Sequence, residues 1–326
     1  MDMKQNTDEP KVRVGVVGGT GYTGSEVLEL LRRHPRADVA FATSRSRAGE
    51  PSPIPGLTFS EPSSERCREV DLVFLCLPHG AGADWVDAIG KGPRIIDLTS
   101  DHRPGSGRED EAVYGLAEFA APKLAEAKLV ANPGCYPTGA IFALMPLVER
   151  GLMDLDRLTI VNAASGVTGA GRTLRVDLLF GEVSENFRAY GEGNRHRHLR
   201  EMKATLPGTS LLFQPHLLPI RRGILETIVV PVPDGVGPDE VREAWVDQYE
   251  SGGAVRVLPE GMPEIRDVVN TDMLHLGVSA VEGVEPPVLT VVAALDNLGK
   301  GAAGQAVQNM NAMMGWNLNE GIRCGP

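Results

Sequence analysis

The first 135 residues alternate short apolar runs with stretches of helical spacing. The apolar runs have the length and composition of buried strands; they are "VRVGVVG", "DVAFATS", "DLVFLCLP", "RIIDLTS" and "KLVAN". Helical patterns such as "GSEVLELLRRH" lie between them. This alternation predicts a parallel sheet with crossover helices over residues 1–135, an α/β domain.

The pattern changes after Gly151. Longer β-type runs follow, with few helical stretches between them: "LTIVNAAS", "SLLFQPHLLPI", "GILETIVVPV", "MLHLGVSAV" and "PVLTVVAAL". They predict a mixed α+β domain over residues 136–297. A last helical pattern, "AAGQAVQNMNAMMG", follows the turn at 297–301, and we expect a C-terminal helix over about 298–326 that packs back on the first domain.

Composition and charge narrow the classes of partner. The 326 residues suffice for two domains with their own cores. The net charge of −11 would repel nucleic-acid phosphates and anionic membranes, so we expect neither as a partner. The N-terminal "MDMKQNTDEP" is polar and no run approaches the ~18 apolar residues of a membrane span, which predicts a cytoplasmic protein. The four cysteines form no C-x-x-C pair, so we expect reduced thiols.

The stretch "VGVVGGTGYTGSEV" contains a glycine-rich loop between a predicted strand and a predicted helix. Glycines at this point let the backbone approach a pyrophosphate, while the helix N-terminus offers free N–H groups. The loop therefore predicts a dinucleotide site, with a purely structural turn as the alternative. The residues assigned to it are Gly18, Thr20, Gly21, Tyr22, Thr23 and Gly24.

The second strand ends in "ATSRSRAG", where an NAD-type site would carry an acidic residue for the ribose hydroxyls. Ser44, Arg45 and Arg47 instead offer hydroxyl and guanidinium groups suited to a 2′-phosphate. This favours NADP(H), with a solvated basic loop as the alternative. The segment "CLPHG", which contains Pro78, ends a third strand at the same sheet edge.

In "NPGCYPTGA", Cys135 follows a strand and begins a predicted helix. A helix N-terminus stabilises negative sulfur, so we expect a lowered thiol pKa and a nucleophile near neutral pH. A structural cysteine is the alternative interpretation.

The segment "YGEGNRHRHLREM" offers groups that could manage a proton. His196, His198 and Glu201 are the candidates, and on a helix His198 and Glu201 share a face, so the carboxylate could orient the imidazole. A zinc site and a pair of surface histidines are the alternatives, but no further ligands stand at suggestive spacing, and we expect no metal.

The motifs together resemble a known family. In order they are "GVVGGTGYTG", "LPHG", "IIDLTSDHR", "VYGLAE", "NPGCYPTG", "SGVTGAGR", "HRH", "PHLLPIRRGI" and "DNLGKGAAGQAVQN". The chain resembles the N-acetyl-gamma-glutamyl-phosphate reductase family over nearly its whole length. The resemblance implies the aspartate-semialdehyde dehydrogenase superfamily fold: a Rossmann-type NADP-binding domain plus an α+β dimerisation and catalytic domain, in a homo-oligomer.

The resemblance also implies site residues. Cys135 is similar to the family's nucleophile and His196 to its acid/base, with His198 supporting it. The implied cofactor contacts include Pro78, Ser165, Gly166 and Asn297, and the implied substrate or phosphate contacts are Arg103, Asn132 and Tyr190. The chain departs from the family's pattern after the second histidine, where Arg200 could meet a larger anionic acyl group.

The implied reaction is NADPH-dependent reduction of an acyl phosphate through a cysteine thioester in arginine biosynthesis, with phosphate released. The same chemistry on N-succinylglutamyl, carrier-linked 2-aminoadipyl or aspartyl phosphate is the alternative. A short-chain dehydrogenase would need a Tyr-x-x-x-Lys pair, which the sequence lacks. A redox-sensing NADP-binding regulator would have no use for Cys135 together with "HRH".

Overall fold

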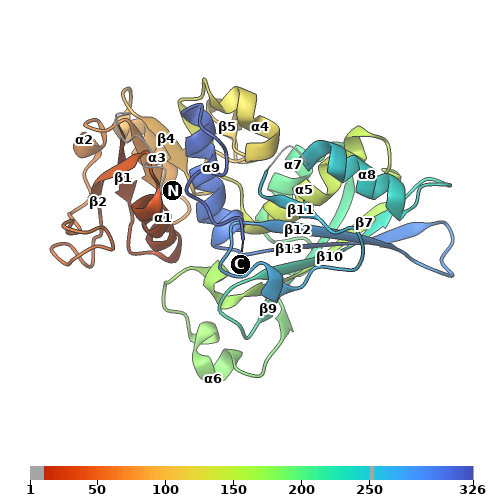
Figure 1. The fold of residues 1–326 in the computed structure, drawn as a ribbon. Coiled ribbons are helices and arrows are strands. Elements are labelled where there is room, and N and C mark those ends of the chain that lie inside the picture. Colours follow the sequence, from red (N-terminus) through yellow and green to blue (C-terminus); the bar gives the residue numbers. More distant parts are fainter. Residues whose placement is uncertain (1–10, 250–252, 326) are drawn as a thin grey trace, which may run out of the picture.

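The computed structural model describes residues 11–249 and 253–325, which form two sheets joined through buried helices (Figure 1). The helices are α1 Tyr22–Arg33, α2 Ser64–Cys67, α3 Gly82–Ile89, α4 Ala117–Leu124, α5 Cys135–Glu149, α6 Phe180–Val183, α7 His198–Thr205, α8 Pro238–Tyr249 and α9 Gly304–Met313. The strands are β1 Val12–Val17, β2 Ala37–Ala42, β3 Leu72–Leu75, β4 Arg94–Asp97, β5 Val113–Tyr114, β6 Leu129–Ala131, β7 Leu158–Gly166, β8 Arg188–Ala189, β9 Ser210–Leu218, β10 Ile224–Pro231, β11 Val255–Val257, β12 Leu274–Ala280 and β13 Val288–Leu295.

The first sheet is parallel throughout, as the sequence predicts. Its strand order is β2-β1-β3-β4-β6-β5. Apolar side chains are fully buried on both faces, with Val16 and Phe74 on one and Val17 and Val73 on the other. Because all the strands run the same way, their carboxyl ends and the loops that follow them meet at one edge of the sheet.

The second sheet is mixed, with the order β11-β12-β13-β10-β7-β9-β8. Most neighbours are antiparallel, while β7 with β9 and β11 with β12 are parallel. Helices α5, α7 and α8 lie over one face, and the segment between β7 and β8, which contains α6, lies on the other side (Figure 1). The predicted α/β class with an α+β second part is confirmed.

Helix α5 runs from the edge of the first sheet into the core of the second part. Its residues are buried nearly all round. Pro146 lies inside it and has no N–H for the carbonyl of Phe142, four residues earlier. The Tyr249 hydroxyl donates to that carbonyl at 2.6 Å and so satisfies it. Helix α8 thereby closes a gap that the proline leaves in the core.

The C-terminal helix is shorter than the range 298–326 that the pattern indicated. A π-helical turn at Gly299–Ala303 leads into α9, which ends at Met313. Gly315 adopts φ 70°, a left-handed conformation that ends the helix. The chain then folds back so that Trp316 stacks on His34, with ring centroids 5.5 Å apart. Helix α9 packs into the core of the first sheet through side chains such as Met310.

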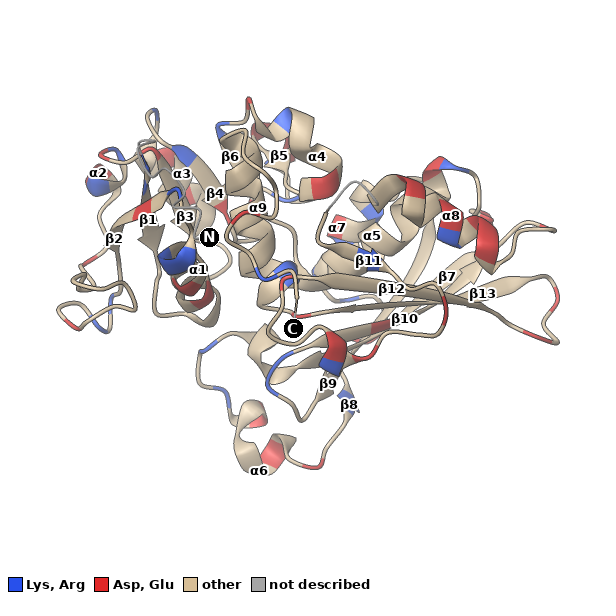
Figure 2. Ribbon diagram, viewed as in Figure 1, with Lys and Arg blue, Asp and Glu red and all other residues tan. Residues whose placement is uncertain are grey.

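Acidic and basic residues are mixed over both parts of the chain (Figure 2). No helix among residues 11–249 and 253–325 is long and apolar enough to cross a membrane. The polar N-terminal decapeptide lies outside the described residues.

Candidate active site

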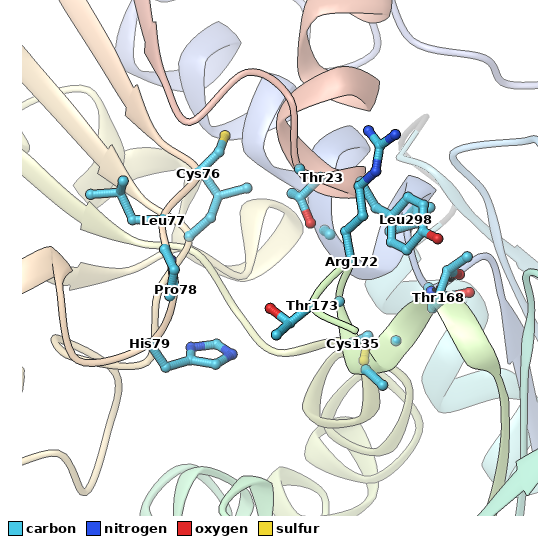
Figure 3. A pocket seen from close by; sticks show the side chains of 18 of the residues that line it. Thr23, Cys76, Leu77, Pro78, His79, Cys135, Thr168, Arg172, Thr173 and Leu298 are labelled. Carbon is cyan, nitrogen blue, oxygen red and sulfur yellow. Dashed lines mark hydrogen bonds between the residues drawn. The ribbon is translucent and has the colours of Figure 1, made fainter. Parts of the chain in front are cut away.

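A cavity of about 1240 Å³ lies between the carboxyl edge of the first sheet and the end of β7 in the second. Figure 3 shows side chains that line it, among them Cys76, His79, Cys135 and Arg172. The structure brings every predicted site residue except Arg47, Arg200 and Glu201 to its wall. These residues are Gly18, Thr20, Gly21, Tyr22, Thr23, Gly24, Ser44, Arg45, Pro78, Arg103, Asn132, Cys135, Ser165, Gly166, Tyr190, His196, His198 and Asn297.

The glycine loop is packed so closely that side chains are excluded from its turn. A Cβ on Gly18, which adopts φ 88°, would lie 2.3 Å from the carbonyl oxygen of Cys76, and one on Gly24 would lie 2.2 Å from that of Gly18. Gly21 caps α1 without a side-chain acceptor, and the first turn of α1 holds no acidic residue. The N–H groups of this helix therefore face the cavity uncapped, which fits the pyrophosphate of a dinucleotide.

The two arginines after β2 have different surroundings. Arg47 forms an ion pair with Glu50 at 2.6 Å and does not line the cavity. Arg45 is exposed, lines the cavity and makes no ion pair within the described part of the chain. Ser44 is buried, and its Oγ lies 2.9 Å from Thr20 Oγ1. Arg45 is thus the guanidinium that remains available to a 2′-phosphate.

Cys135 is the first residue of α5, but the predicted lowering of its pKa is wrong for the chain alone. Burial raises the pKa of the Cys135 thiol to about 11, although the Arg197 charge and the Tyr136 backbone N–H oppose this shift. The loss of solvation outweighs the helix N-terminus even though Cys135 is only half-buried at the cavity wall, because the surrounding protein leaves the thiol little contact with water. Cys135 is therefore a neutral thiol in this state.

The two imidazoles gather around Tyr136. The ring centroids of His196 and His198 are 4.8 Å apart, and both rings meet that of Tyr136 edge-on at 5.8 and 5.9 Å. Burial lowers the pKa of His196 to about 4 and that of His198 well below its usual value, so both are neutral at pH 7. The His198 backbone N–H donates to His196 Nδ1 at 3.2 Å, which places the hydrogen of the neutral His196 ring on Nε2.

Glu201 does not orient His198, contrary to the prediction from their helical spacing. Its Oε1 accepts the Gly134 N–H at 2.8 Å and the Tyr114 hydroxyl at 2.7 Å. Its Oε2 lies 3.5 Å from Arg103 Nη1. The Glu201 carboxylate thus holds the backbone of Gly134, the residue before Cys135, and makes no hydrogen bond to the His198 ring within the described part of the chain.

Arg103 is anchored by backbone carbonyls. Its Nε donates to Asn132 at 2.7 Å and its Nη2 to Leu98 at 3.0 Å. Its buried Nη1 has no hydrogen-bond partner in the described part of the chain. That nitrogen lies 2.9 Å from where a Cβ on Gly134 would be, beside the nucleophile.

The predicted asparagines line the cavity but are bonded within the protein. Asn297 Oδ1 accepts the Gly223 N–H at 2.9 Å, and its Nδ2 donates to Thr168 Oγ1 at 2.9 Å. Asn132 Oδ1 accepts from Asn309 Nδ2 at 3.0 Å. Tyr190 is tied to the wall in the same way, since its hydroxyl lies 2.9 Å from that of Tyr136.

The sequence analysis missed Arg197, which lines the cavity between the two histidines. Its Nη2 donates to His79 Nε2 at 2.8 Å, and its charge is the one that lowers the pKa of Cys135 most strongly. The expectation for Arg200 is wrong, because that residue is exposed, packs beside Gly105 and does not line the cavity. The sequence did offer a sign of Arg197, since it is the middle residue of the "HRH" motif. In residues 11–249 and 253–325 no group of three His, Cys, Asp or Glu could hold a metal ion.

Comparison with known proteins places these residues in a family. Residues 13–127 match the model described as semialdehyde dehydrogenase, NAD binding domain, and residues 135–297 match semialdehyde dehydrogenase, dimerisation domain. An N-acetyl-gamma-glutamyl-phosphate reductase of Saccharophagus degradans is 41% identical, covering 95% of this chain and 98% of the relative. The chain belongs to the N-acetyl-gamma-glutamyl-phosphate reductase family. One of Pelotomaculum thermopropionicum is 40% identical over 97% and 98% of the two chains.

Solved structures share the fold of this reductase family. Aspartate semialdehyde dehydrogenase II from Vibrio cholerae matches with a TM-score of 0.76 at 18% identity, covering 93% of this chain and 98% of that one. Aspartate semialdehyde dehydrogenase with NADP from Candida albicans matches with a TM-score of 0.67 at 17% identity, covering 94% and 99%. The predicted superfamily fold is confirmed, and the chain is an oxidoreductase of the semialdehyde dehydrogenase type.

Proposed function

We propose that the chain reduces N-acetyl-glutamyl 5-phosphate to N-acetyl-glutamate 5-semialdehyde with NADPH, releasing phosphate, as a step of arginine biosynthesis. The observation that carries the proposal is that Cys135, two neutral imidazoles and the glycine loop face one cavity. The printed names of relatives at about 40% identity over almost the whole chain support the same substrate.

The cofactor assignment is NADP(H). The uncapped N-terminus of α1 and the glycine cradle fit the pyrophosphate, while Arg45 and Ser44 suit the 2′-phosphate. When bound, NADPH supplies the hydride that reduces the acyl carbon. We also assign Pro78, Ser165 and Gly166 to the cavity wall around it.

Cys135 is the proposed nucleophile. Its sulfur attacks the acyl carbon, the bond from that carbon to the phosphate oxygen breaks, and the thiol proton leaves with the phosphate, so that a thioester remains on the protein. Because burial raises the pKa of Cys135 to about 11, the developing negative sulfur depends on the nearby positive charges of Arg197 and Arg103. The Cys135 N–H at the start of α5 is suited to bind the oxygen of the acyl group.

His196 is the proposed proton donor. Its Nδ1 accepts the His198 N–H, so Nε2 carries the hydrogen that can pass to the oxygen of the hemithioacetal. As the C–S bond breaks and the carbonyl forms, the hydroxyl returns its proton to His196 Nε2, and a proton from solvent restores the Cys135 thiol. The rings of His198 and Tyr190 both contact the His196 ring edge-on, with centroids 4.8 and 5.6 Å from it, and so keep it in place.

Arg103 is the proposed phosphate contact. Its Nη1 is buried beside Gly134 without a hydrogen-bond acceptor in the described part of the chain, whereas its other nitrogens are already bonded. A phosphate leaving from Cys135 would provide that acceptor. Asn132, which holds Arg103 through its carbonyl, and Glu201, which holds Gly134, act as positioning residues.

The division of labour follows the two sheets. We assign most of the cofactor contacts to residues 1–135 with the C-terminal segment 298–326, and substrate binding and self-association to residues 136–297, the part that matches a dimerisation domain. Ser165 and Gly166 face the cofactor from this second part. We propose a cytoplasmic homo-oligomer.

The test is phosphate-dependent reduction of NADP⁺, assayed in the oxidative direction with several semialdehydes. N-acetylglutamate 5-semialdehyde should give the highest kcat/KM, and N-succinylglutamate, aspartate and carrier-linked 2-aminoadipate semialdehydes should give values lower by at least ~10-fold. A Cys135→Ser variant serves as the control for background reduction. A higher kcat/KM for any of the other aldehydes would overturn the substrate assignment.

A further inference from the structure

Arg172 connects the second sheet to the glycine loop across the cavity. It follows the short 3₁₀ turn Val167–Ala170 at the end of β7, yet its Nη1 donates to the carbonyl oxygen of Thr20 at 2.8 Å. Its guanidinium carbon also lies 6.0 Å from the ring centroid of Tyr22. Both contacts are with the loop at the N-terminus of α1, and Figure 3 shows Arg172 among the lining side chains.

The charge of Arg172 has no carboxylate partner in the described part of the chain. Two other arginines between β7 and β9 are neutralised, since Arg175 and Arg188 form ion pairs with Asp177 at 2.7 and 3.2 Å. Arg172 instead donates to a neutral carbonyl and is otherwise exposed. A hydrogen bond between ionised partners is roughly twice as strong as a neutral one, so an anion at this position would compete well for the guanidinium.

We propose that Arg172 is a cofactor-binding residue whose guanidinium exchanges the Thr20 carbonyl for the pyrophosphate of the dinucleotide. The inference rests on the proposed NADP(H) dependence. The Arg172 guanidinium already contacts Thr20 and Tyr22, at the N-terminus of α1 that we assign to the pyrophosphate. The exchange therefore requires only rotation of the Arg172 side chain. Because Arg172 comes from the second sheet, the contact joins both parts of the chain around the bound cofactor.

The alternative is a clamp that stays on Thr20 and never meets the ligand. The two roles differ in what they do to affinity. A clamp contributes to the stability of the chain, whereas a pyrophosphate contact contributes to the binding of every ligand that contains a pyrophosphate.

Cofactor fragments separate Arg172 from Arg45. ADP-ribose contains the pyrophosphate and no 2′-phosphate, while 2′-AMP contains the 2′-phosphate and no pyrophosphate. Arg172 should therefore affect ADP-ribose, NADH and NADPH alike, and Arg45 should affect only NADPH and 2′-AMP.

The experiment measures dissociation constants by fluorescence titration and calorimetry for Arg172→Met, Arg172→Lys and Arg45→Ala. Arg195→Met is the matched control, because Arg195 is exposed, donates to the carbonyl of Glu192 at 2.9 Å and does not line the cavity. Arg172→Met should weaken NADPH, NADH and ADP-ribose by about 10- to 100-fold each, the range of a charged hydrogen bond, and leave 2′-AMP unchanged. Arg172→Lys should restore part of the affinity.

The inference is overturned if Arg172→Met binds NADPH and ADP-ribose within two-fold of the wild type, or if it loses 2′-AMP equally, which would indicate a collapsed site. Melting temperatures of all variants check the second case. Neither result touches the proposed function. A wild-type chain that binds neither dinucleotide would remove the proposed function and this inference with it.

Discussion

Glu226 lies within β10, and its side chain is buried beneath α5. Its exposed fraction is 0%, and neither carboxyl oxygen has a hydrogen-bond partner in the described part of the chain. Its Oε2 lies 2.6 Å from where a Cβ on Gly139 would be, one helical turn after Cys135. Burial raises the pKa of Glu226 well above its ordinary value, so the folded chain holds a neutral acid there.

This neutral acid makes stability depend on pH in a definite direction. An unfolded glutamate ionises near ~4.3, while the folded one keeps its proton. Its contribution to stability is therefore complete below the unfolded pKa and is lost as the pH rises toward the folded value. The loss is about 1.4 kcal/mol per pH unit for as long as Glu226 stays protonated. Replacing Glu226 with Gln removes it.

Urea unfolding at pH 5, 6 and 7 measures the effect, provided that refolding is reversible. The difference between the free energy of unfolding of Glu226→Gln and that of the wild type should rise by about 1.4 kcal/mol, in favour of the variant, for each unit by which the pH increases. Glu226→Met should also be more stable than the wild type at pH 7, because it removes an unsatisfied polar group. Glu243→Gln, at an exposed position on α8, is the control and should follow the wild type. Parallel curves for Glu226→Gln and the wild type would refute the reasoning.

The remaining predictions concern the residues around the nucleophile. His196→Asn should lower kcat by ~10²–10⁴ without abolishing thioester formation, while His198→Asn should mainly raise KM; steady-state and single-turnover kinetics check this, and the reverse ranking would assign the proton to the other ring. Iodoacetamide should label Cys135 slowly at pH 7, with a rate that rises toward a pKa of about 11; a plateau below pH 8.5 would contradict the effect of burial. Gly134→Ala should lower kcat by ~10²-fold, because the new Cβ would lie 2.7 Å from His198 Nε2, whereas Gly181→Ala, with nothing within 4 Å, should leave kcat and the melting temperature unchanged.

Local patterns predicted much of the fold because they determine local structure. The apolar runs of the first half became parallel strands, and the glycine spacing predicted a turn that the close approach of Gly18 to Cys76 requires. The start of α5 at Cys135 was also readable from the sequence. Each of these depends on residues close together in the chain.

The errors concern properties that long-range contacts decide. The pKa of the Cys135 thiol depends on how far several distant segments together shield it from water, which no single segment encodes. His198 and Glu201 do lie in one helix, as their spacing predicted, but the Glu201 carboxylate accepts the N–H of Gly134, which belongs to a distant segment. The bond from Arg172 to Thr20 joins residues 152 positions apart, and sequence spacing carries no sign of it.

The central claim is that Cys135 carries the acyl group as a thioester. The most direct measurement is intact and peptide mass spectrometry of the chain mixed with N-acetyl-glutamyl 5-phosphate in the absence of NADPH. The account predicts an added acyl mass on the peptide that contains Cys135, sensitive to hydroxylamine, and no adduct or turnover in Cys135→Ala. An unmodified wild-type peptide, together with a Cys135→Ala variant that reduces the acyl phosphate at a comparable rate, would contradict it.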